Sequence, residues 1–180
     1  EGGVRIPMIW SWPEQLPAGE THTGVVSSLD LLPTFMAAAG ARPLPLSATR
    51  AHEDKGNRAK HVKAYGAYDG VNVLPQIAGE SVPGSRTLFW RLQGQTAVLD
   101  GSDKLITLSH RRAQMFQPAA DLAESVDRFN TDPTRADELF QVLGRWESSL
   151  ATVPLWGSSP YWIGQSAKHY DTWPVRPEPQ

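Results

Sequence analysis

The sequence contains no cysteine, which excludes disulfide bonds, thiolate metal sites and an encoded cysteine nucleophile within these 180 residues. It has no apolar run of membrane-spanning length, so we expect no membrane contact. It has no basic run longer than Arg111-Arg112 and a net charge of -2, so nothing indicates a nucleic-acid partner. It also lacks an initiator Met and begins inside a glycine turn, so we expect a further portion in front of Glu1.

The first part of the chain predicts a strand, a loop and a helix. Gly2-Gly3 is typical of a tight turn, and Met8-Ile9-Trp10 predicts a buried strand that ends at Pro13. The segment between Ser27 and Gly40 has capping side chains at its start and a glycine at its end, as helices do. The apolar stripe of this helix comprises Leu29, Leu32, Phe35, Met36 and Ala39.

The middle of the chain is less regular. Residues 41–68 are rich in Pro, Lys, Arg and small residues and predict a long surface loop. Residues 69–79 predict a turn followed by a short helix.

From residue 88 the hydrophobic period becomes two, which predicts an antiparallel meander with strands at 88–92, 96–99, 104–108 and 113–116. Asp132-Pro133 predicts the start of a helix, and its apolar face suits packing across that sheet. That face comprises Ala136, Leu139, Phe140, Leu143, Trp146 and Leu150.

The opening segment, Glu1–Pro7, resembles the EGGxRxP segment of the formylglycine-dependent sulfatases, members of the alkaline-phosphatase superfamily. Further family landmarks follow in family order. They are Ser28–Thr34 (S-x-D-x-x-P-T), Asp69–Pro75 (DGx-(ND)-LLP), Leu88–Trp90 (L-(FY)-W), Ala97–Ile106 (AVR-x-GDWKLI, with Ser102-Asp103 where the family often has Asp-Trp) and Met115–Glu124 (a degraded LYDLxxDPxE). The resemblance excludes the loop at 46–68 and the tail after Trp156.

The resemblance is to the C-terminal portion of a sulfatase. It implies that the nucleophile, a formylglycine made from Cys or Ser in a C/S-x-P/S-x-R motif, lies on an N-terminal portion. The Ca2+ ion, its Asp and Asn ligands, and the Lys and His residues that bind sulfate are implied there too. No such motif stands in this sequence, so we expect no catalytic residue and no metal ligand here, and an inactive chain when alone.

The fold class that follows is α/β, with an α+β arrangement in this piece. Residues 1–85 correspond to the last strand and helix elements of the large alkaline-phosphatase-like α/β domain, with the long loop at 41–68. Residues 86–153 correspond to a C-terminal subdomain, a four-stranded antiparallel sheet packed with one helix. Residues 154–180 form an irregular tail rich in Trp and Pro.

Several polar residues are candidates for substrate binding. They are Arg91, Gln93 and Gln95 on the first hairpin, His52 and His61 in the basic loop, and His110. For the hairpin residues the exposed face of a strand stays open as an alternative, and for the histidines a plain surface position does. Glu1 and Arg5 are candidates for contacts behind the active site, with local capping and pairing to a buried carboxylate as the alternatives. Lys104 is interpreted as a structural residue without chemistry.

The resemblance thus implies part of a sulfatase that hydrolyses sulfate esters, this chain supplying scaffold and one wall of the substrate cleft. The expected partners are the N-terminal portion and a sulfated carbohydrate or aryl sulfate, and assembly into homo-oligomers stays open. A periplasmic or secreted location is expected by resemblance. Two alternatives remain, a stand-alone glycan-binding or interaction module and a phosphonate or phosphodiester hydrolase of the same superfamily.

Overall fold

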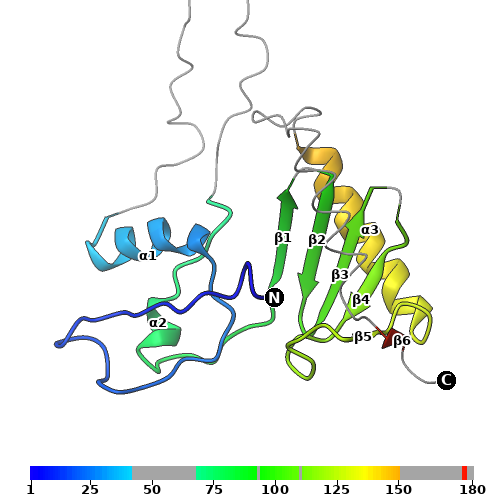
Figure 1. The fold of residues 1–180 in the computed structure, drawn as a ribbon. Helices are drawn as coiled ribbons and strands as arrows, with labels where there is room; N and C mark the ends of the chain where they lie inside the picture. The colour runs from blue at the N-terminus through cyan, green and yellow to red at the C-terminus, as the bar shows by residue number, and fades with distance from the viewer. Residues whose placement is uncertain (42–67, 93, 110, 151–175, 178–180) are drawn as a thin grey trace, which may run out of the picture. The chain divides into compact units, whose positions relative to one another are not determined.

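The computed structural model describes residues 1–41, 68–92, 94–109, 111–150 and 176–177 (Figure 1). Its contacts divide the chain into two compact units. The sheet unit comprises Glu1–Met8 and Ser85–Gln180, and the helix unit comprises Ile9–Gly84. The first eight residues therefore belong with the second half of the chain, which the sequence division at residue 85 does not foresee. The predicted loop at 41–68 and most of the tail lie outside the described residues.

The sheet unit contains the predicted four-stranded antiparallel meander. Strands β1 (Thr87–Leu92), β2 (Gln95–Asp100), β3 (Asp103–Leu108) and β4 (Gln114–Phe116) pair in sequence order. Gly101 has φ 62° in the turn between β2 and β3, a conformation that glycine adopts without strain. A short strand β5 (Val126–Asp127) pairs in parallel with β6 (Arg176–Pro177).

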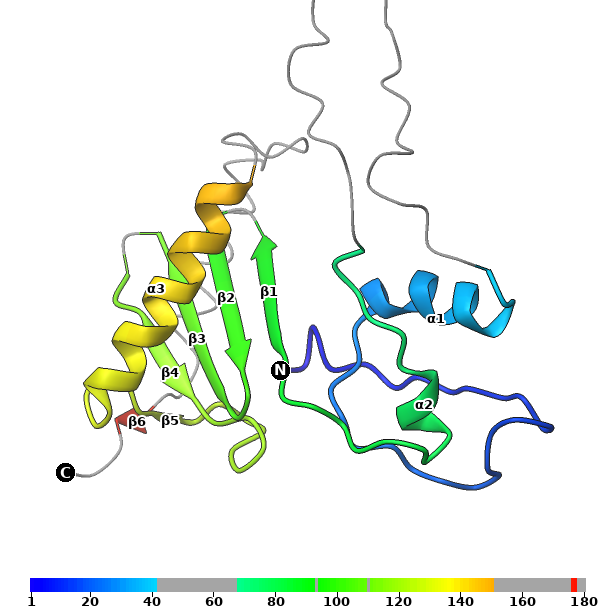
Figure 2. The same ribbon diagram turned by 180° about the vertical axis from the view of Figure 1, so that it is seen from behind.

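Helix α3 (Pro133–Ser149) lies across one face of the sheet, as predicted (Figure 2). The Asp132 carboxylate caps its first turn by accepting a hydrogen bond from the Arg135 main-chain nitrogen at 3.1 Å. Phe89 stacks on Trp146 with ring centroids 4.9 Å apart. The buried core between helix and sheet comprises Val98, Leu105, Ala113, Met115, Ala136, Leu139 and Leu143. Each leucine buried there contributes about 1.5–3 kcal/mol, so this packing holds the unit together.

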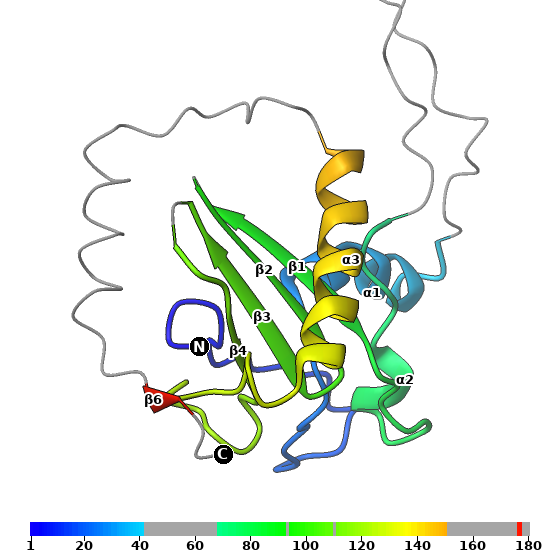
Figure 3. The same cartoon turned by 90° about the vertical axis from the view of Figure 1, so that its right-hand side faces the viewer.

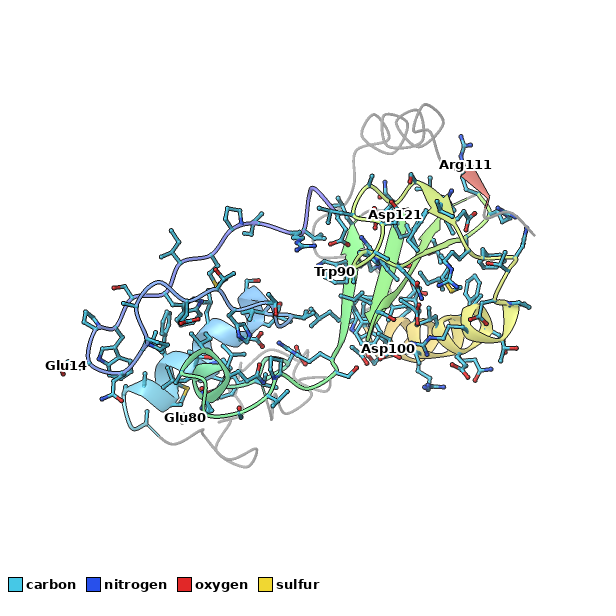
Figure 4. The ribbon with its side chains drawn as sticks, turned by 90° about the horizontal axis from the view of Figure 1, so that it is seen from below. Glu14, Glu80, Trp90, Asp100, Arg111 and Asp121 are labelled. Atoms are coloured by element: carbon cyan, nitrogen blue, oxygen red, sulfur yellow. The ribbon has the colours of Figure 1, made fainter. Side chains whose placement is uncertain are left out.

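Arg135 fastens the first turn of α3 to the turn between β2 and β3. Its guanidinium donates to the carboxylates of Asp100 at 2.8 Å and Asp103 at 3.0 Å. The Thr87 hydroxyl also donates to Asp100, and this bond together with Arg135 lowers the pKa of the Asp100 carboxyl. Figure 4 shows Asp100 beside α3, while Trp90 lies on the other side of the sheet.

The helix unit contains the 3-10 helix η1 (Ser28–Asp30), α1 (Leu31–Ala38) and α2 (Leu74–Ile77). The capping predicted for the first helix is confirmed. The Ser27 side chain accepts from the Leu29 nitrogen, and the Asp30 carboxylate accepts from the Ser27 nitrogen at 2.7 Å. Gly40 and Gly79, past the ends of α1 and α2, have φ of 65° and 79°, as glycines that end helices do.

Two buried polar side chains join the helix start to the turn before α2. The Asp30 carboxylate accepts a hydrogen bond from the Val71 nitrogen at 2.9 Å, and the Thr34 hydroxyl accepts one from the Val73 nitrogen at 3.0 Å. A Cβ on Gly70 would lie 2.0 Å from the Leu29 carbonyl oxygen, so only glycine fits there. The S-x-D-x-x-P-T and DGx-(ND)-LLP segments are therefore two halves of one structural contact.

The buried strand predicted at Met8-Ile9-Trp10 is wrong. No strand forms within residues 1–41, and Ile9 is 93% exposed. A strand needs a neighbour for its main-chain groups, and no described strand of this chain lies beside these residues. The apolar composition of Met8-Ile9-Trp10 predicted that these side chains are buried, but it could not identify the residues that would cover them.

We expect Gly70→Ala to disrupt the helix unit, because the added methyl group overlaps main-chain atoms of Leu29 that cannot move aside cheaply. The predicted loss of unfolding free energy is about 1–3 kcal/mol or more. Amide exchange at Val71 and Val73 measures it. Gly84→Ala is the matched control, since nothing lies within 4 Å of the position that its added Cβ would take. Equal exchange rates in both variants would contradict this account.

We also expect the free energy of unfolding to fall at acid pH as the Asp100 carboxylate becomes protonated. Because its pKa is lower in the folded chain than in the unfolded chain, its contribution is present above about pH 4 and is lost as the pH falls through the folded pKa. The carboxylate is partly exposed, so the effect is about 1 kcal/mol or less. Urea titrations between pH 7 and pH 2.5 should show a shallower pH dependence for Asp100→Asn than for wild type. An unchanged slope in Asp100→Asn would refute the prediction.

Candidate functional site

The structure describes four of the eight predicted site residues. Arg91, Gln95, Glu1 and Arg5 lie within the described ranges. The other four, His52, His61, Gln93 and His110, lie outside them. Their roles stay predictions.

Arg91 lines a shallow hollow of about 370 Å³ at the edge of the sheet unit. Arg91 on β1, Thr96 on β2 and Thr107 on β3 are direct neighbours across the strands and therefore share the α3 face of the sheet. The two threonine hydroxyls lie 2.6 Å apart. The lining is completed by Gly94, Leu108, Ser109 and Glu147.

The lining of this hollow offers both hydrogen-bond donors and acceptors. It combines the Arg91 guanidinium, the Glu147 carboxylate and the hydroxyls of Thr107 and Ser109, which also bond to the Thr96 hydroxyl and to the Gly94 carbonyl oxygen. With one side chain of each charge sign, the lining suits a ligand rich in hydroxyl groups. The lining is a poorer match for a bare anion, because binding an anion would be favoured by a second cation in place of the Glu147 carboxylate.

Gln95 does not share this hollow. The register pairs Arg91 with Thr96 and Leu92 with Gln95, and successive side chains on a strand point to opposite faces. Arg91 and Gln95 therefore stand on opposite faces of the hairpin. The structure does not bring these two candidates together.

A second polar cluster lies on the sheet face opposite α3, where the first residues of the chain run (Figure 3). The Lys104 ammonium on β3 donates to the carboxylates of Glu1 and Glu124, each at 2.7 Å. Lys104 is 5% exposed, so the cluster is shielded from water.

Lys104 stays charged in this setting. Burial by itself lowers the pKa of an ammonium group, but the hydrogen bonds from Lys104 to Glu1 and Glu124 outweigh it, and the net pKa of Lys104 is raised. A protonated lysine cannot act as a nucleophile or base. The interpretation of Lys104 as a residue without chemistry agrees with this geometry.

Glu124 is held in place by a tight loop. Its φ is 52°, in the left-handed region that residues other than glycine rarely occupy. The Asp121 carboxylate accepts hydrogen bonds from the main-chain nitrogens of Ser125 at 2.7 Å and Val126 at 2.8 Å and so fixes the loop on both sides. The degraded motif at Met115–Glu124 thus retains Asp121, which fixes the loop, and Glu124, which binds Lys104.

Arg5 and Glu1 depart from their sequence-based alternatives. Arg5 is exposed, and within the described residues its side chain makes no ion pair with a buried carboxylate. The Glu1 carbonyl accepts hydrogen bonds from the nitrogens of Val4 at 3.0 Å and Arg5 at 2.9 Å, which closes the predicted glycine turn. The Glu1 carboxylate is bound by an ammonium group, whereas the sequence analysis weighed main-chain capping.

The part of the chain that the structure describes contains no group of three or more His, Asp or Glu side chains arranged to hold a metal ion. None of the helices described there is long and apolar enough to cross a membrane.

Comparison with curated proteins finds sulfatases, although no family model matches the chain. Arylsulfatase G of Mus musculus is 33% identical over 113 residues, which are 63% of this chain and 18% of that protein. Arylsulfatase A of Homo sapiens is 58% identical over 45 residues, 25% of this chain and 8% of that protein. Human steryl-sulfatase is 33% identical over 81 residues, 45% of this chain and 11% of that protein.

Solved structures with a similar fold include two whose names report a bound ligand. Ps i-CgsB in complex with k-i-k-neocarrahexaose superposes with a TM-score of 0.61 and 21% identity, over 89% of this chain and 33% of that chain. BT4656, solved with its substrate D-glucosamine-2-N,6-O-disulfate, superposes with a TM-score of 0.53 and 18% identity, over 76% of this chain and 27% of that chain. At these identities the likeness shows the fold.

The sequence matches and the fold agree with the landmarks in the chain. The chain spans 18% or less of the length of each curated relative described above. By sequence, the chain is similar to arylsulfatases and to a steryl-sulfatase, and it corresponds to a part of them.

Proposed function

We propose that the chain is the C-terminal portion of a sulfatase that hydrolyses sulfate esters, with the catalytic residues on a portion that precedes Glu1. One observation carries the proposal. The chain is similar in sequence to sulfatases, yet it contains no cysteine and no C/S-x-P/S-x-R motif. The nucleophile and calcium ligands of such an enzyme are then supplied by the preceding portion. No step of the reaction is assigned to a residue of this chain.

The exposed apolar side chains of the helix unit support a role as one part of a larger domain. Leu29, Leu32 and Phe35 project from the predicted apolar stripe, and each is more than half exposed. Ile9, from the segment predicted as a strand, is exposed as well. Soluble proteins rarely leave such side chains clustered in water, so a covering surface is expected. In the proposed enzyme, the preceding portion of an alkaline-phosphatase-like α/β domain covers them.

The substrate proposed for the enzyme is a sulfated carbohydrate. The hollow at Arg91 supports this choice because its donors and acceptors match sugar hydroxyl groups. The ligands named for two proteins of similar fold are carbohydrates too. The Arg91 hollow then forms part of the cleft wall. A periplasmic or secreted location suits an enzyme acting on such material.

The complete protein should hydrolyse an aryl sulfate such as 4-nitrophenyl sulfate, whereas the isolated 180-residue chain should be inactive. A denaturing mass spectrum of the active protein should show a portion with a C/S-x-P/S-x-R motif carrying the formylglycine mass change. A complete protein without sulfatase activity, together with an isolated chain that folds cooperatively and binds sulfated glycan, would support the binding module instead.

Arg91→Ala should change the preference of the complete enzyme between substrates. Loss of one partly exposed, charge-assisted hydrogen bond should lower kcat/KM for a sulfated oligosaccharide by about tenfold, and for a small aryl sulfate by less than about twofold. Arg145→Ala, an exposed arginine on α3 outside the hollow, is the matched control and should change neither value. Equal losses on both substrates would rule out the cleft-wall role.

A further inference from the structure

Among the described residues, the ion pair between Glu1 and Lys104 joins the first residues of the chain to the sheet. The Glu1 carboxylate is bound by Lys104, and the Glu1 carbonyl accepts hydrogen bonds from the nitrogens of Val4 and Arg5. Residues 2–8 are exposed. The conformation at the start of the chain is therefore held through Glu1.

The groups that hold Glu1 are themselves rigid. Lys104 stands on β3, an inner strand that pairs with β2 on one side and β4 on the other. Glu124 is presented by the loop that Asp121 fixes. A buried ionic cluster of this kind adds little net stability, because desolvation offsets the attraction between the charges. What it supplies is a defined orientation, since Lys104 binds the Glu1 carboxylate from β3 and also contacts Glu124.

We propose that Lys104 is a positioning residue that, through Glu1, orients the portion of the enzyme adjoining the start of this chain. This inference rests on the proposed function, which places the catalytic portion directly before Glu1. Lys104 touches no reacting group. It connects an inner strand of the sheet to the point where the two portions join.

The first arm of the test measures the attachment in the 180-residue chain. Backbone order parameters of Val4 and Arg5 should be about 0.8 in wild type and below about 0.6 in Lys104→Met and in Glu1→Gln. Lys104→Arg, which keeps the positive charge, should restore most of the order. Arg135→Met is the matched control, because it removes a cation on the α3 face of the same strands and leaves the Glu1 contacts intact. Glu1→Gln lies outside the strands and keeps the test valid if Lys104→Met does not fold.

The second arm measures turnover in the complete enzyme, normalised to folded protein. Displacing the adjoining portion by a fraction of an ångström or more should lower kcat for an aryl sulfate by about tenfold or more in Glu1→Gln and Lys104→Met, with KM changed less. Arg135→Met should keep kcat within about twofold of wild type even if its melting temperature falls.

The outcomes separate the two proposals. Unchanged order at Val4 and Arg5 overturns the attachment through Lys104. If order at Val4 and Arg5 is lost but kcat is unchanged, the positioning role is overturned, and the contact between Lys104 and Glu1 is structural only. A complete wild-type protein without sulfatase activity overturns the proposed function and the positioning role with it, while the order parameters still decide whether Lys104 holds the segment.

Discussion

The packing of α3 against one face of the four-stranded sheet is the interaction on which the rest of the sheet unit depends. Since side chains alternate between faces, covering Val98 and Leu105 with α3 leaves Lys104 on the opposite face, where the first residues of the chain lie. Two cations thus make contacts on opposite sides of β3. Arg135 joins Asp103 of β3 to the helix, and Lys104 joins β3 to Glu1.

The helix unit is stabilised differently. Its described part has few buried apolar side chains, and its buried polar residues, Asp30 and Thr34, hold the turn at 70–73 by main-chain hydrogen bonds. Its apolar stripe faces outward. The helix unit thus has hydrogen bonds within itself and an apolar outer surface. One layer of a larger α/β domain would have the same features if it were separated from its neighbouring layers.

Local patterns predicted the elements of this fold well. The alternation from residue 88 and the cap at Asp132 specify strands and helix through contacts within a few residues, and the structure confirms both. The ion cluster joins residues 103 positions apart, which no local pattern encodes, so Lys104 was recognised only as a structural residue. The strand at Met8-Ile9-Trp10 failed for the same reason, because pairing depends on a neighbouring strand, and no described strand of this chain lies beside these residues. For the candidate site, the register that pairs Arg91 with Thr96 places Gln95 on the other face of the hairpin, which composition alone does not predict.

Amide hydrogen exchange of α1 tests the central claim most directly, if it is measured in the isolated chain and in the complete protein. If the chain is one part of a sulfatase domain, the covering portion should slow exchange of residues 31–38 by about a hundredfold or more in the complete protein. Equal exchange rates in both would mean that the outward apolar stripe stays uncovered, and would contradict the account of this chain as part of a larger catalytic domain.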